Sequence, residues 1–75
     1  MSLKRELAKE IEGLENEIRI LESKRMRSMA AVVEALASKT EPDEYELQYF
    51  RRYTADIDER RGKLIDLMVR LKHLT

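Results

Sequence analysis

Apolar residues in the first half of the chain recur at alternating steps of four and three. The run begins at Leu7 and continues through Ile11, Leu14, Ile18 and Leu21. This heptad spacing, with charged residues around it, predicts a coiled-coil helix over residues 3–38.

The next seam position is Arg25, after which the pattern is expected to resume at Met29, Val32 and Leu36. The two consecutive steps of four around Arg25 predict a stutter, which unwinds a supercoil locally. Past Arg25 the apolar face also broadens, because Met26 and its apolar neighbours join it.

A second heptad run in the chain predicts another helix over residues 43–74. The run consists of Phe50, Tyr53, Ile57, Arg60, Leu64, Leu67, Leu71 and Leu74. Its apolar stripe widens near the end, where Ile65, Met68 and Val69 lie outside the seam.

The segment between the two runs carries signals for ending one helix and starting another. Pro42 is the only proline, and proline is tolerated in the first turn of a helix but not in its interior. Thr40 or Glu41 can cap the second helix, and the acids that follow suit the positive end of its dipole. We therefore expect a turn at residues 39–42 and a single all-α domain over residues 1–75, an antiparallel two-helix hairpin.

The hairpin register places each polar seam residue near a partner of opposite charge. If the turn centres near residue 40, Arg25 falls near Asp56 and Arg60 falls near Glu22. These four residues are the predicted polar pairs of the seam.

Composition limits how such a hairpin can be stabilised. A chain of 75 residues buries only about 60% of its unfolded surface. The absence of cysteine rules out disulfides and thiolate metal sites. We therefore expect a four-helix bundle, completed either by dimerisation or by a different protein. The chain lacks an apolar run long enough to span a bilayer and a signal-peptide core, which predicts a cytoplasmic protein.

No pattern of reactive residues points to catalysis. His73 is the only histidine, and no Glu-x-x-His motif of a di-iron bundle is present. We expect no enzyme activity, no cofactor and no metal. Fifteen basic and fifteen acidic residues also argue against nucleic acid as the main partner. A nucleic-acid accessory role is the least favoured alternative, and it would use the arginines at four positions: Arg51, Arg52, Arg60 and Arg61.

The surplus of apolar residues outside the seams predicts a partner surface, since uncovered apolar patches mark interaction sites. The expected interface residues lie near the turn and near the C-terminal end: Tyr45, Leu47, Tyr49, Ile65, Met68 and Val69. The function expected is a non-catalytic adaptor or small co-chaperone. The alternative is a structural coiled coil in which the same residues bury a homodimer seam.

The stretch EPDEYELQY, between two amphipathic helices in a short chain, resembles the turn of the small co-chaperones of type III secretion needle subunits. In that family a helical hairpin carries an acidic-Pro-x-x-Tyr element at the start of its second helix. Glu41, Pro42 and Tyr45 match this element, whereas Lys39-Thr40 stands where the family has a glycine. The resemblance implies a cytoplasmic hairpin that pairs with a tetratricopeptide-like chaperone and keeps the needle subunit unpolymerised.

Overall fold

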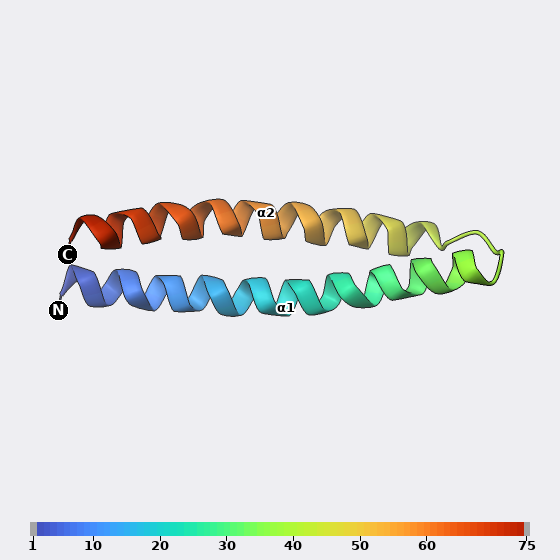
Figure 1. Ribbon diagram of the computed structural model, residues 1–75, viewed down its shortest axis with the longest axis horizontal. Helices are drawn as coiled ribbons and strands as arrows, with labels where there is room; N and C mark the ends of the chain where they lie inside the picture. Colours follow the sequence, from blue (N-terminus) through green and yellow to red (C-terminus); the bar gives the residue numbers. More distant parts are fainter. Residues whose placement is uncertain (1, 75) are drawn as a thin grey trace.

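The chain forms two long helices that lie antiparallel and pack along their whole length (Figure 1). In this computed structural model the described residues are 2–74, so Met1 and Thr75 of the predicted domain lie outside them. Helix α1 spans Leu3–Ala37 and helix α2 spans Glu44–His73. The predicted helical hairpin is confirmed, and residues 2–74 contain no strand.

The turn begins with a helix C-terminus in which Lys39 adopts a left-handed backbone conformation, with φ of 56°. Two bonds then close α1: the N–H of Thr40 donates to the Ala35 carbonyl at 2.9 Å, and the N–H of Lys39 donates to the Leu36 carbonyl at 3.1 Å. This is a Schellman motif, which usually places glycine at the left-handed position. The Thr40 hydroxyl also donates to the Ala35 carbonyl, at 2.9 Å.

The cap of α2 differs from the prediction. Asp43 is the N-cap, and its carboxylate accepts a hydrogen bond of 2.8 Å from the N–H of Tyr45. Neither Thr40 nor Glu41 caps α2, because the Thr40 hydroxyl is already bonded to the end of α1. Pro42 precedes the cap instead of lying in the first helical turn, and proline favours an extended residue before it.

The seam of α1 keeps an unbroken heptad, so the predicted stutter is wrong. Beyond Arg25 the inward positions are Ser28, which is buried, and the partly buried Val32 and Ala35. These positions extend the alternating steps of four and three to the end of α1, which keeps α1 in phase with the heptad of α2. Met29, a predicted seam residue, lies half-exposed outside the seam.

The apolar core is small and lies mostly toward the open end of the hairpin, where the two termini meet (Figure 1). Ile57 is its only fully buried large side chain among residues 2–74. Leu7, Ile11 and Ile18 of α1 are the other buried apolar residues. The remaining apolar seam residues are only partly covered, because a two-helix hairpin has no further layer to shield them.

Candidate protein-interaction surfaces

Because the α1 seam keeps an unbroken heptad, a row of large apolar side chains on α1 faces outward. These side chains form the α1 stripe, which we define as Met26, Met29, Val33 and Leu36. Their exposed fractions are 70%, 51%, 56% and 60%. Steps of three, four and three place all four on one face of the helix, in the half of α1 next to the turn.

Three of the predicted interface residues form a second exposed cluster, on α2 near the open end. We call it the open-end patch: Ile65, Met68 and Val69, exposed by 61%, 54% and 48%. Ile65 and Met68 follow Arg61 by four and seven residues, so they share its side of α2. Arg61 lines a hollow with Glu22 of α1, and Glu22 lines another hollow with Met26 and Met29. The open-end patch and the α1 stripe therefore lie on the same long side of the hairpin, at opposite ends.

The other predicted interface residues divide between exposed and half-buried positions. Tyr45 and Tyr49 are exposed by 69% and 47%. Leu47 is only partly exposed, and it lies closer to the interhelical contact than the prediction assumed. Leu47 is therefore partly used by the hairpin itself.

The tyrosines lie on the opposite long side of the hairpin from the α1 stripe. Tyr49 stacks on Tyr53, with ring centroids 6.3 Å apart and an angle of 24° between the planes. Both rings line a hollow with the buried Ser28 and with Lys24, whereas Met29 lines a hollow with Phe50. The small Ser28 side chain thus leaves room for aromatic rings on this side.

The ion pairs between the helices differ from the predicted pairs. Arg60 donates to Glu17 at 2.9 Å, and Arg61 donates to Glu22 at 3.1 Å. Glu17 and Glu22 line hollows on opposite sides of the seam, so each neighbouring arginine pairs with the glutamate on its own side. Arg60 therefore does not pair with Glu22 as predicted.

The second predicted pair, Arg25 with Asp56, is not formed. Arg25 is partly buried in the seam and has no ion pair among residues 2–74. The backbone carbonyl of Asp56 accepts a hydrogen bond of 3.2 Å from Arg60. Arg25 lines one hollow together with Met29 and Phe50.

The basic residues considered for nucleic acid are only partly available. Arg60 and Arg61 are bonded to glutamates across the hairpin, as above. Arg51 and Arg52 are exposed, and no ion pair holds them within the described chain. Nucleic-acid-binding proteins typically carry a basic patch or stripe, whereas Arg51 and Arg52 are two adjacent residues.

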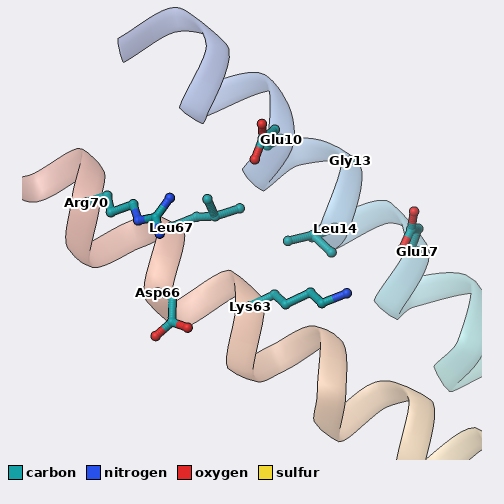
Figure 2. Close-up of a pocket in the computed structure, with 8 residues that line it drawn as sticks. All are labelled: Glu10, Gly13, Leu14, Glu17, Lys63, Asp66, Leu67 and Arg70. Carbon is teal, nitrogen blue, oxygen red and sulfur yellow. The ribbon is translucent and has the colours of Figure 1, made fainter. Parts of the chain in front are cut away.

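A hollow between the helices on the tyrosine side shows the kind of groove that the hairpin offers (Figure 2). Leu14 and Leu67 point toward each other across it, and charged side chains surround them. The lining residues are Glu10, Gly13, Leu14, Glu17, Lys63, Asp66, Leu67 and Arg70. Helix α1 supplies two acids to this hollow, whereas α2 supplies two bases and one acid. The hollow holds no nucleophile beside a general base.

The described residues also lack an assembled metal site and a membrane-spanning helix. No group of three or more histidine or carboxylate residues among 2–74 is arranged to hold a metal ion. His73 lines a hollow with Leu3, Leu7 and Leu74 at the open end. Neither α1 nor α2 combines the length and apolar character needed to cross a bilayer.

Comparisons of the chain with protein-family models, curated proteins and solved structures found no match.

Proposed function

We propose that this protein is a non-catalytic interaction module, an adaptor or small co-chaperone that presents apolar helix faces to other proteins. The observation that supports the proposal most strongly is the distribution of large apolar side chains. Among residues 2–74, four are buried in the core, whereas twelve are exposed by 46% or more. Exposed apolar residues grouped on one side of a molecule mark interaction surfaces.

The accessible area of the hairpin leads to the same proposal. The chain exposes 6220 Å², whereas a compact monomer of its mass exposes about 4,800 Å². The difference exceeds the roughly 800 Å² that each partner buries in a standard interface. Covering one apolar side would bring the accessible surface area of the hairpin close to that of a compact domain of the same mass.

We propose the open-end patch as the site for a different protein. Ile65, Met68 and Val69 present aliphatic surface over about one helical turn, which fits the apolar face of an amphipathic partner helix. Methionine suits such a surface because its flexible side chain adapts to its neighbours.

The resemblance to the needle-subunit co-chaperones suggests a class of partner, a tetratricopeptide-like chaperone, and a cytoplasmic location. Two features of the turn support it. Lys39 has the left-handed conformation that glycine adopts without steric cost, next to the point where the family has its glycine. Tyr45, the tyrosine of the acidic-Pro-x-x-Tyr element, is largely exposed in the first turn of α2.

Site-specific photo-cross-linking in the source cells tests the open-end patch. A photoreactive residue at position 65 is expected to give one product larger than two copies of the chain. The matched control is position 58, which lies one heptad earlier on the same ridge of α2 and carries an exposed aspartate. The product should disappear in Met68→Lys, and its protein component, once purified, should bind the wild-type chain and not this variant.

Two outcomes would contradict the proposed use of this patch. A product with the mass of two chains would assign the patch to self-association, and equal products at positions 65 and 58 would show non-specific contact. The partner class has its own test, a titration with a purified tetratricopeptide-type needle chaperone. Binding that Tyr45→Ala and Met68→Lys both weaken would support that class, and no binding would exclude it.

A further inference from the structure

We infer that the hollow beside Ser28 and Tyr53 binds a carboxylate group that is joined to an apolar body. The hollow has a volume of about 340 Å³, at the lower end of the range for small-ligand pockets. Its lining residues come from both helices: Lys24, Arg27, Ser28, Glu46, Tyr49 and Tyr53. This inference goes beyond the proposed function, because the hollow lies on the opposite long side of the hairpin from the open-end patch.

The hollow contains a buried hydroxyl group without a partner. Ser28 is only 5% exposed, yet its hydroxyl forms no hydrogen bond within residues 2–74. By contrast, the Thr54 hydroxyl of α2 donates to the Phe50 carbonyl at 2.9 Å. No side-chain oxygen or nitrogen in this part of the chain is both unbonded and sealed from solvent, so the Ser28 hydroxyl remains accessible. Buried polar groups usually have a partner, and a ligand oxygen in the hollow would supply one.

The charged side chains around this hydroxyl favour a ligand with a single negative charge. Lys24 and Arg27 are exposed, and neither forms an ion pair within the described chain. Glu46 lines the same hollow, so its three charged side chains sum to one positive charge. A carboxylate balances that charge, and it matches the planar fork of a guanidinium. A phosphate monoester, with a charge of about −1.5 to −2, would add repulsion from Glu46.

The two tyrosine rings provide surface for the apolar part of the ligand. Tyr49 stacks on Tyr53, and both rings line the hollow. Tyr49 is still 47% exposed, so the stacked pair is not used up by the hairpin itself. Ligand pockets typically combine aromatic side chains with a few polar groups that fix the orientation of the ligand. A carboxylate attached to a ring or an aliphatic group therefore fits this hollow better than a free inorganic anion does.

Titration of the full chain with phenylacetate, followed by amide NMR, tests the site. Phenylacetate should shift the amide signals of Ser28 and Tyr49, with a dissociation constant in the millimolar range that suits so small a ligand. Arg27→Gln should raise this constant at least about tenfold, and Ser28→Ala about twofold to tenfold, because each removes one hydrogen bond to the carboxylate. The matched control Arg51→Gln changes an exposed arginine outside the hollow and should leave the constant unchanged. Helical circular dichroism of each variant shows whether the chain still folds.

Further probes separate the parts of the ligand and its source. At equal concentration, 2-phenylethanol should give no shifts and phenyl phosphate should bind more weakly than phenylacetate. A helical peptide of leucine and glutamate that binds more tightly than phenylacetate would identify an acidic protein segment as the source. Equal or weaker binding of that peptide would identify a small carboxylate.

Three results would overturn the inference. They are an absence of shifts with phenylacetate, equal shifts with sodium chloride, and tighter binding of phenyl phosphate. None of these results depends on cross-linking at position 65, so failure of the carboxylate site would not count against the proposed partner site.

Discussion

Ser28 of α1 and Tyr53 of α2 lie beside the same hollow between the helices, with Ser28 buried and Tyr53 partly buried. The seam thus places a small side chain beside an aromatic ring. This arrangement turns the neighbouring Met29 out of the seam, with 51% of its surface exposed. The α1 stripe is a direct consequence.

The first prediction concerns this seam position. Ser28→Leu adds volume next to Tyr53 and should lower the free energy of unfolding by about 1–3 kcal/mol, the usual cost of overpacking. Met29→Ser should change the stability of the monomer by no more than about 0.5 kcal/mol, because that residue contributes little to the hairpin. Urea unfolding of both variants in a Val33→Glu background separates hairpin stability from association. If Met29→Ser is the more damaging change, the register described above is wrong.

A second prediction concerns the core. Ile57 has no exposed surface, so Ile57→Ala removes buried methyl groups and leaves a cavity, which costs about 2–5 kcal/mol. For a hairpin with so small a core, this loss should abolish most of the helical circular dichroism signal at 25 °C. Ile20 is 57% exposed and serves as the control, since Ile20→Ala should retain the signal. Equal losses in the two variants would contradict the described core.

A substitution in the turn should stabilise the hairpin, whereas the core substitution Ile57→Ala destabilises it. Lys39 has φ of 56°, a conformation that is strained for a residue with a Cβ atom. Lys39→Gly should therefore raise the midpoint of thermal unfolding, by a free-energy gain of up to about 1 kcal/mol. Ser38 has φ of −84°, so Ser38→Gly should lower the same midpoint because glycine only adds freedom to the unfolded chain.

Arg25 and Arg60 should respond differently to replacement by leucine. Arg25 is partly buried without an ion pair, so Arg25→Leu should stabilise the hairpin by up to about 1 kcal/mol through apolar packing in the seam. Arg60 bonds to Glu17 and to the Asp56 carbonyl, so Arg60→Leu loses contacts as it gains apolar surface. Urea midpoints should place Arg25→Leu above wild type and above Arg60→Leu. A midpoint for Arg25→Leu below that of wild type would contradict this assignment.

Most of the hairpin could be predicted from the sequence, because strong local signals specify it. The heptads of apolar residues predict two helices, and the acids after Pro42 predict that the second helix starts there. The cap was missed because Pro42 was expected in the first helical turn, which would place the cap before the proline. Only the hydrogen bonds of the turn show that Thr40 closes α1 and Asp43 opens α2.

The seam near the turn could not be predicted in the same way, for a physical reason. Hydrophobicity favours Met29 and Leu36 as seam residues, whereas the heptad phase favours Ser28 and Ala35. Packing against α2 decides between them, and it selects small residues where α2 supplies aromatic rings. The sequence offers one signal for the α1 stripe: if the heptad is continued past Arg25 without a break, Met29 and Leu36 fall outside the seam. The open-end patch was identifiable because Ile65, Met68 and Val69 lie outside the α2 seam in any register.

This hairpin leaves most of its large apolar side chains uncovered, and we therefore expect it to fold as part of an assembly. The most direct measurement is the solution mass of the purified chain by light scattering, with its helix content, across a wide concentration range. We expect a mass of twice 8.9 kDa at micromolar concentration and a loss of helix on dilution. A monomer that stays fully helical at every concentration would contradict it.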